Sequence, residues 1–396
     1  MATQSLVSIG WSGTANAFTA GQAAARMALQ RLATHQAQFA LVFGSSWFDQ
    51  AKLLEGVRTV FATIPVAGGS TAGEIIPEGP RSHSCVVLAI AYDDIVASVG
   101  VGVEVERNPR LAGYQAAQQA LRQFSGRSRS GFLLFGDGLL TGYAEVVRGI
   151  QEVLGTSSLV TGGLMGDDLR FSQTHQYAHD RVVSGSVVGL LLGGSCTIGV
   201  GMEHGFAPIS KPWHVTRAQA NILYELDGRP ASLVYEEYFG SAGLESVQQA
   251  GLTRQLIAYP LGVQQDSTGQ FLLRNVLTFG RDGSLVCSGE ITQGAAVHLM
   301  IGSRELVLEA AVRAARHAIE SLRFVRFVLV FDSVVRKRLL GRDAATELLR
   351  IRQTVGPTVP LAGCYTYGEQ APFGNSLPYG QSSVQTGAVL VVAVGP

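Results

Sequence analysis

The chain has 396 residues, of which 48 are glycine and 15% are charged. This length allows two or three domains, and the low charge and high glycine content are typical of a chain that is mostly buried or turning. Basic and acidic residues number 30 each and form no run of like charge, so the composition argues against binding to nucleic acid or to an anionic membrane surface.

The sequence carries no clear signal for secretion or membrane insertion. Its N-terminus lacks the basic and apolar regions of a signal peptide. The longest uncharged stretch, Val182–Met202, is divided by Gly193-Gly194 into two β-rich runs, which favours a hairpin over a bilayer span. The four cysteines form no CxxC pair, and we therefore expect them to be reduced thiols, mostly in the core. We expect a soluble cytoplasmic protein with no membrane span.

Three similar sets of elements follow one another along the chain. Alanine-rich segments with helical spacing predict helices at Gly21–Ala33, Tyr114–Phe124 and Glu305–Leu322. Apolar runs typical of buried strands follow them and end at Gly44, Gly136 and Asp332. Further β-rich runs begin at Cys85, Ser186 and Ala388.

A glycine-acid motif lies between the two apolar runs of each set. Pro65–Pro77 reads PVAGGSTAGEIIP and Pro360–Pro372 reads PLAGCYTYGEQAP, which are identical at seven of thirteen positions. A degraded third copy, VTGGLMGDD, begins at Val160, and we expect Asp167 to stand where Glu74 and Glu369 stand.

Strands that alternate with helices predict an α/β fold with mixed sheets, built from repeated helix-strand-helix-strand units. Between the second and third units lies β-rich material, with short strands expected at Trp213–Ala220 and Ile222–Leu226 and a meander from Phe271. The sequence therefore predicts two domains. One covers residues 1–215 with two repeat units, and the other covers residues 216–396 with the third unit and the β-rich insert.

The glycine-acid motifs are the first candidates for chemistry. Glycines let the backbone approach a ligand, and the threonine hydroxyls and glutamate carboxylates suit a small polar molecule. Alternatively, the glycines only make tight turns and each glutamate accepts backbone N–H bonds. Arginines near apolar strands, among them Arg336, are further candidates for contacts to an anion, with surface ion pairs as the alternative. The candidate ligand-binding residues are Thr71, Glu74, Asp167, Arg170, Arg274, Thr366, Tyr367 and Glu369.

Usual enzyme signatures are missing. The nucleotide loop GxxxxGK[ST] and the GxSxG elbow are absent, and no GxGxxG follows a strand and opens a helix. An enzyme that acts on a small amide- or peptide-like substrate, with Glu74 and Glu369 as acid and base, remains the alternative function.

Three histidines are candidates for a cofactor ligand. His204 follows a strand and precedes Phe206, which would suit the axial ligand of a haem in an apolar pocket, and a structural hydrogen-bonded role is the alternative. His175 and His179, which are four residues apart, are the next candidates after His204. On a strand they would lie about 13 Å from each other, too far for one metal ion to bridge, so no metal site is predicted.

Taken together, these segments resemble the FIST family of bacterial sensory proteins. The matching segments, in the family's order, are GGSTAGEI, GGLMGDD, HGFAP with HVTRAQANILYELDGRPASLVYEEYFG, and PLAGCYTYGE. The resemblance implies an N-terminal and a C-terminal FIST region and a signal-transduction module for small ligands such as amino acids. Some stand-alone FIST proteins are haem proteins that sense nitric oxide and regulate a kinase.

The expected function is therefore a stand-alone sensor without catalytic activity. It would bind a small molecule or gas and signal to a separate partner such as a histidine kinase, and it could form a homo-oligomer. A haem b sensor of nitric oxide is the sharper version of this hypothesis. A family resemblance indicates the fold and the general role better than it indicates the ligand.

Overall fold

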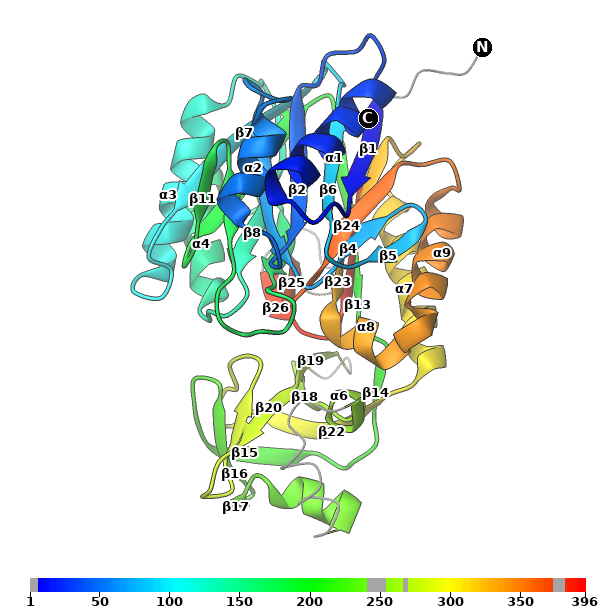
Figure 1. The fold of residues 1–396 in the computed structure, drawn as a ribbon. Coiled ribbons are helices and arrows are strands. Elements are labelled where there is room, and N and C mark those ends of the chain that lie inside the picture. Colours follow the sequence, from blue (N-terminus) through cyan, green and yellow to red (C-terminus); the bar gives the residue numbers. More distant parts are fainter. Residues whose placement is uncertain (1–5, 241–253, 266–269, 373–381) are drawn as a thin grey trace.

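The computed structural model describes residues 6–240, 254–265, 270–372 and 382–396. The three repeat units form a large α/β body, and the insert forms a smaller β-rich part beside it (Figure 1). The predicted α/β class and the mixed sheets are confirmed. All four cysteines are buried and free. No helix within the described ranges has the length and apolar character needed to cross a membrane.

Each unit has a leading strand, a helix, a buried strand, a second helical segment, a glycine-rich strand, a hairpin and a closing strand. The first unit comprises β1 (Val7–Ser12), α1 (Ala17–Arg31), β2 (Phe39–Ser45), α2 (Gln50–Arg58), β3 (Val66–Thr71), β4 (Glu74–Ile76), β5 (Gly79–Arg81) and β6 (Cys85–Ile90). The second comprises β7 (Ile95–Gly102), α3 (Pro109–Gln123), β8 (Arg129–Asp137), α4 (Tyr143–Leu154), β9 (Val160–Met165), β10 (Gln176–Ala178), β11 (Arg181–Val183) and β12 (Val187–Gly194). The third comprises β13 (Thr197–Glu203), α7 (Arg304–Ile319), β23 (Phe327–Ser333), α8 (Val334–Leu340), α9 (Ala344–Val355), β24 (Leu361–Thr366), β25 (Gly368–Pro372), β26 (Ser382–Gln385) and β27 (Val389–Gly395).

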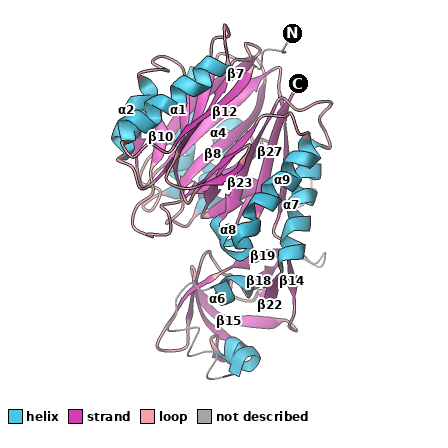
Figure 2. Ribbon diagram, turned by 45° about the vertical axis from the view of Figure 1, so that its right-hand side comes forward, coloured by secondary structure: helices cyan, strands magenta, loops and turns pink. Residues whose placement is uncertain are grey.

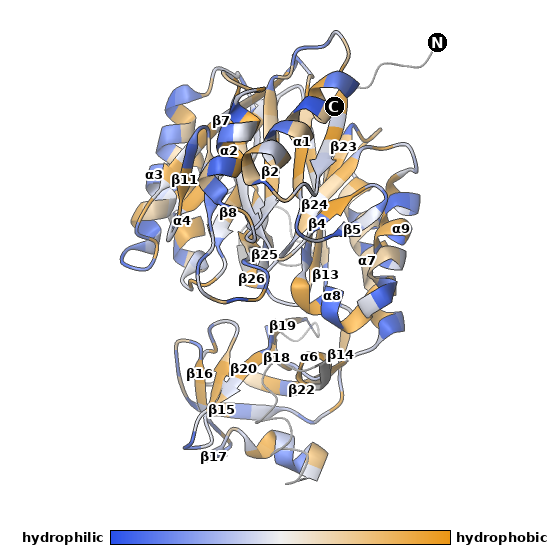
Figure 3. Ribbon diagram, viewed as in Figure 1, coloured by the Kyte–Doolittle hydropathy of each residue, from blue (hydrophilic) through white to orange (hydrophobic). Residues whose placement is uncertain are grey.

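Four strands of each unit form the same mixed arrangement. In the first unit β2 lies parallel to β3 and antiparallel to β6, which pairs with the edge strand β1. The second and third units repeat this order as β9-β8-β12-β7 and β24-β23-β27-β13. Helices cover the outer faces of the sheets in Figure 2, and Figure 3 shows hydrophilic residues along these helices and apolar residues along the strands. This distribution follows from strands that are buried on both faces.

The units exchange their hairpins. The hairpin β4–β5 of the first unit adds to β24 of the third, β10–β11 of the second adds to β3 of the first, and β25–β26 of the third adds to β9 of the second. Each six-stranded sheet is therefore completed by the next unit in a cycle. As a result, no unit holds all its backbone hydrogen bonds alone, and the three units form one interlocked body.

The centre of the body is a cluster of three phenylalanines. Phe43, Phe135 and Phe331 occupy equivalent places in β2, β8 and β23, and all three are fully buried. Their ring centroids lie 6.1 to 6.3 Å apart, with two tilted pairs and one edge-to-face pair. These separations are favourable for aromatic rings, so each repeated strand contributes one ring to a shared core.

Alanine-rich helices lie very close to the sheets. A Cβ atom added to Gly10 would lie 2.0 Å from the carbonyl oxygen of Ala24 in α1, and one added to Gly100 would lie 1.9 Å from that of Ala116 in α3. Only glycine allows this approach of strand and helix backbones. The high glycine and alanine content of the chain thus reflects close helix-to-sheet packing.

The insert lies within the third unit, between β13 and α7. Its elements are β14 (Phe206–Pro208), β15 (Trp213–Gln219), β16 (Ile222–Leu226), β17 (Arg229–Pro230), α6 (Arg254–Ala258), β18 (Leu261–Gln264), β19 (Phe271–Arg274), β20 (Val276–Phe279), β21 (Leu285–Cys287) and β22 (Ala296–Gly302). The boundary expected between residues 215 and 216 falls inside β15. The preceding strand β13, from the expected N-terminal domain, pairs with β27 of the third unit.

Candidate functional site

The first glycine-acid motif closes around its own glutamate. Oε1 of Glu74 accepts a hydrogen bond from Thr71 Oγ1 at 2.5 Å, and Oε2 accepts bonds from the backbone N–H and the hydroxyl of Ser84 at 3.1 and 2.6 Å. The carboxyl group is fully buried. Burial raises the pKa of Glu74 to about 7, against the hydrogen bonds from Ser84 and Thr71, which lower it.

The motif of the third unit, Pro360–Pro372, repeats this arrangement. Thr366 Oγ1 donates to Oε1 of Glu369 at 2.7 Å, and the backbone N–H of Ala388 donates to Oε2 at 3.2 Å. Glu369 is also fully buried, and burial raises its pKa. In both motifs the glutamate ties its hairpin to the start of the closing strand. This geometry matches the alternative in which each glutamate accepts backbone N–H bonds.

The expected position of the third acid is wrong. In the strand register, Glu74 lies opposite Cys364 of β24, and Glu369 lies opposite Gly163 of β9. The equivalent residue of β3 in the first sheet is Gly69, and the residue opposite it is Gln176. Asp167 lies in the loop before β10 instead. Gln176 is fully buried, and its Nε2 donates to Thr174 Oγ1 at 3.0 Å, as a neutral counterpart of the threonine-glutamate pairs. The connection between the glycine-rich strand and the hairpin is longer in the second unit than in the other two. The spacing of the sequence motif did not show this difference, so it pointed to Asp167.

A cleft of about 250 Å³ lies where the second unit, the hairpin β25–β26 and the insert meet. The loop after β8 forms one wall, and strands β19 and β18 of the insert form another. Its lining includes Gly138, Leu140, Thr141, Gly142, Leu164, Arg274, Ser288, Glu290, Tyr367, Val384 and Thr386. Of the sequence-predicted residues, the cleft brings together Arg274 and Tyr367. Thr71, Glu74, Thr366 and Glu369 are buried elsewhere, and Arg170 is exposed outside the cleft.

Arg274 is the charged group of this cleft. Only 7% of the residue is exposed, and its Nε and Nη1 donate to the carbonyl oxygens of Glu290 and Leu273 at 2.8 and 2.9 Å. Among the described residues, no carboxylate lies within ion-pair distance of it, and its Nη2 makes no hydrogen bond. Burial lowers the pKa of Arg274 to about 10, which leaves it protonated at neutral pH. The guanidinium thus brings to the cleft a positive charge that forms no ion pair with the described residues, although the charge of the cleft-lining Glu290 acts on it from farther away.

The start of helix α4 borders the same cleft. Its N-cap, Gly142, has a left-handed backbone with φ 84° and supplies no side-chain cap. Glycine is suited to this conformation, and the first N–H groups of a helix form a positive end that attracts anions. Sequence reasoning missed this loop, although the glycine-rich segment GDGLLTG directly after a buried strand could have indicated it. Ser288 and Thr386, whose hydroxyls lie 3.0 Å apart, were also missed.

Tyr367 lines the cleft and contacts Asp167. Its hydroxyl donates to Asp167 Oδ1 and accepts a hydrogen bond from the backbone N–H of Leu169 at 2.7 Å. Burial by itself would raise the pKa of the Asp167 carboxyl group. The hydrogen bonds from the tyrosine hydroxyl and from backbone N–H groups have the larger combined effect, so the pKa is lowered. Asp167 is therefore a buried anion that organises its own loop, and Tyr367 joins that loop to the cleft.

His204 does not present a free ring nitrogen to a haem iron. Nδ1 of His204 accepts a hydrogen bond from the backbone N–H of Phe206 at 2.9 Å, so the neutral ring carries its proton on Nε2 and has no lone pair there for iron. Burial and the nearby Arg336 lower the pKa of His204 to about 4. The Nδ1 atom of His175 is buried, and neither His175 nor His179 lines the cleft.

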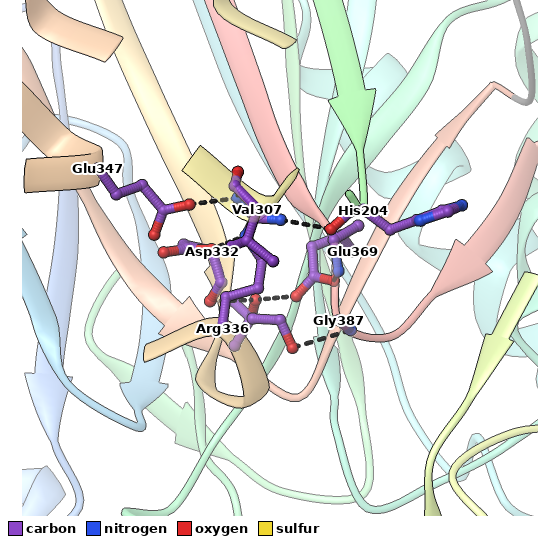
Figure 4. A network of polar contacts seen from close by, with 10 residues as sticks. His204, Val307, Asp332, Arg336, Glu347, Glu369 and Gly387 are labelled. Carbon is purple, nitrogen blue, oxygen red and sulfur yellow. Dashed lines mark hydrogen bonds and ion pairs between the residues drawn. The ribbon is translucent and has the colours of Figure 1, made fainter. Parts of the chain in front are cut away.

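Arg336 holds a buried ion network instead of contacting a ligand. It pairs with Asp332 at 3.1 Å and with Glu347, and it donates to the carbonyl oxygens of His204 and Val307 at 2.7 and 2.9 Å, as Figure 4 shows. The three charged side chains are fully buried. Burial and the neighbouring Glu347 raise the pKa of Asp332. The network ties β23, α8 and α9 to the strand that leads into the insert.

Two family models match the chain. The FIST N domain model covers residues 38–229, and the FIST C domain model covers residues 231–372. The chain belongs to the FIST family. FIST domains are associated with sensing in signal transduction. The cleft of this FIST protein uses residues from both matched regions, because the loop after β8 lies in the first and Arg274 and Tyr367 lie in the second.

Solved structures show only distant similarity to this FIST protein. A cyanuric acid hydrolase from A. caulinodans is 11% identical, with 99% of each chain covered and a TM-score of 0.34. A second cyanuric acid hydrolase structure is 11% identical over 98% of each chain, with a TM-score of 0.32. PurLQS from Thermotoga maritima is 11% identical over 98% of this chain and 72% of that chain, with a TM-score of 0.22. No curated protein matches the sequence.

Proposed function

We propose that this FIST protein is a sensor without catalytic activity that binds a small molecule with a carboxylate group in the cleft. Arg274 carries the proposal, because its buried guanidinium reaches the cleft with no carboxylate partner among the described residues. An unpaired buried charge is costly, and removal of one partner from a buried pair costs about 3 to 5 kcal/mol. An anionic ligand that completes the pair would recover much of that cost.

The other lining residues support a ligand of amino-acid size. The uncapped start of α4 adds a second attraction for a carboxylate. The hydroxyls of Ser288 and Thr386 are already bonded to each other and to the carbonyl oxygen of Leu273. Leu140, Leu164 and Val384 form an apolar wall for a short side chain. Pockets for small molecules commonly have this combination of apolar walls and few polar groups. The exposed Glu290 lies at the edge, where its carboxylate suits an ammonium group.

The position of the cleft supports a role in signalling. Its walls come from the second unit, from the hairpin of the third unit and from the insert. A ligand that contacts all three parts favours the arrangement in which it makes the most contacts, so it shifts the population of conformations. We infer that a separate cytoplasmic protein, such as a histidine kinase, responds to this arrangement.

Thermal unfolding of the whole chain tests the ligand site. We expect L-alanine to raise the melting temperature, by a free energy of about 2.7 kcal/mol at one hundred times its Kd. L-Alaninamide, which lacks the carboxylate, should give no shift. The Arg274→Met variant should lose the response, whereas Arg127→Met, a change at an exposed arginine, should keep it. No carboxylate-dependent shift with L-alanine or with the other small amino acids would contradict the proposal.

The acid-base alternative has no comparable support. Glu74 and Glu369 are both fully buried, and their oxygens are engaged by threonine, serine and backbone donors. A substrate would have to open two hairpin junctions to reach them. A general acid or base must come within hydrogen-bond distance of the group that it serves.

A further inference from the structure

The loop Gly166–Gln173, here called the strap, has an unusual backbone. Asp168, Leu169 and Phe171 have φ values of 56°, 64° and 51°, so three non-glycine residues within four positions are left-handed. Side chains disfavour this conformation, and such residues persist only when the surroundings hold them. Strained segments of this kind tend to occur at ligand clamps and switch regions.

Asp167 is the main contact that holds the strap. Its carboxylate accepts backbone N–H bonds from Phe171, Ser172 and Gln173 at 2.9, 2.7 and 3.0 Å, and it also accepts the bond from Tyr367. Only 1% of Asp167 is exposed. Charge-assisted hydrogen bonds are stronger than neutral ones, so one carboxylate fixes the C-terminal half of the strap.

A second carboxylate attaches the strap to the first unit. Oδ2 of Asp168 accepts hydrogen bonds from the hydroxyls of Ser45 and Ser46 at 2.7 and 2.8 Å. The backbone N–H of Asp168 also donates to the carbonyl oxygen of Thr71 at 3.1 Å. The strap therefore connects the end of β2 in the first unit to Tyr367 in the motif of the third unit.

Tyr367 links the strap to the cleft. Its ring stacks on the exposed Phe171 with centroids 5.1 Å apart and planes 22° apart, and its hydroxyl bonds Asp167 and the backbone of Leu169. The same side chain lines the cleft beside Gly138 and Leu164. The equivalent positions in the other motifs are Ala72 and Gly166, which have no side chain that could make this link.

We propose that Asp167 is a positioning residue for the cleft, which acts through Tyr367, and that occupation of the cleft stabilises the strap. This inference rests on the proposed function, since it concerns the same cleft. A ligand that packs against Tyr367 favours the ring position in which the hydroxyl reaches Asp167. Linkage is reciprocal, so whatever holds the strap also raises the affinity of the cleft.

Hydrogen exchange on the whole chain tests this coupling, with L-alanine as the probe. We expect saturating L-alanine to slow exchange of the Phe171, Ser172 and Gln173 amides about fivefold or more, the lower end of typical coupling between sites. In Tyr367→Phe the probe still binds through Arg274, but protection of the three amides no longer changes. Phe171→Ala alters an exposed side chain, keeps the core intact and should weaken the response.

The affinity for L-alanine gives the second readout. Asp167→Asn should lower it about fivefold or more, whereas Asp180→Asn, a change at an exposed position in the next turn, should leave it unchanged. If L-alanine raises the melting temperature but leaves the strap amides unchanged, the coupling is refuted and the proposed function stands. If the same protection appears in Tyr367→Phe, Tyr367 is not the link and the inference is refuted. If neither L-alanine nor any other small amino acid binds, the proposed function fails and this inference fails with it.

Discussion

Replacement of Glu74 by glutamine should make the protein more stable at high pH. The native carboxyl group has a pKa of about 7, compared with an ordinary value of 4.5, because it is buried. Between these two pH values the folded chain keeps a proton that the unfolded chain has lost. The free energy of unfolding therefore falls as the pH rises, and the loss through this group approaches about 3 kcal/mol above pH 7. Glutamine has no such proton to lose.

The second repeat unit carries an amide at the equivalent position, where its nitrogen is hydrogen-bonded and its oxygen has no partner among the described residues. Gln176 pairs in the same register as Glu74 and donates to Thr174 Oγ1 at 3.0 Å. In Glu74→Gln the new amide group can donate to Thr71, and its oxygen can accept from Ser84. At pH 5 most of the native glutamate is protonated and resembles the amide, so wild type and variant should have similar stabilities there.

Urea unfolding between pH 5 and pH 8.5 measures the effect. The stability of Glu74→Gln relative to wild type should rise by about 2.5 kcal/mol over this range. Glu78→Gln removes an exposed carboxyl group of the same hairpin and serves as the control. A relative stability of Glu74→Gln that stays constant with pH, or that falls as the pH rises, would refute the argument from burial.

Three further substitutions test the packing. Arg336→Met leaves Asp332 and Glu347 buried without their counter-charge, and urea unfolding should show a loss of about 3 to 5 kcal/mol. Phe331→Ala removes one ring of the central cluster and should also cost about 3 to 5 kcal/mol, with a smaller loss for Phe331→Leu; equal losses would argue against tight packing there. Gly68→Ala places a Cβ atom 1.9 Å from a backbone oxygen of β2 at φ 146°, so we expect little soluble protein on expression, and normal yield would contradict this contact.

Local patterns in the sequence determined the repeated elements of this protein. Runs such as FLLFG, with apolar side chains on both faces, predict buried strands, and alanine periodicity predicts helices that pack on them. Both signals depend only on neighbouring residues, because a strand or helix buries the same face wherever it lies. The recurrence of the motif around Glu74 and Glu369 likewise predicted a repeated α/β design, and the segments in the FIST order predicted the family.

Pairing between distant segments required the tertiary structure. The motif spacing could not show that Gln176, and not Asp167, is the counterpart of Glu74, because strand register depends on which hairpin reaches which sheet. The exchange of hairpins between units is equally invisible in the sequence, since each hairpin has the same local pattern whichever sheet it joins.

The charges show the same division. Arg274 and Arg336 have similar sequence contexts beside apolar strands. Arg336 is enclosed by Asp332 and Glu347, whereas Arg274 borders a cleft and forms no ion pair with the described residues. A residue type supplies the charge, and only the folded chain decides which charges are neutralised. The candidate binding site depends on that distribution of partners in space.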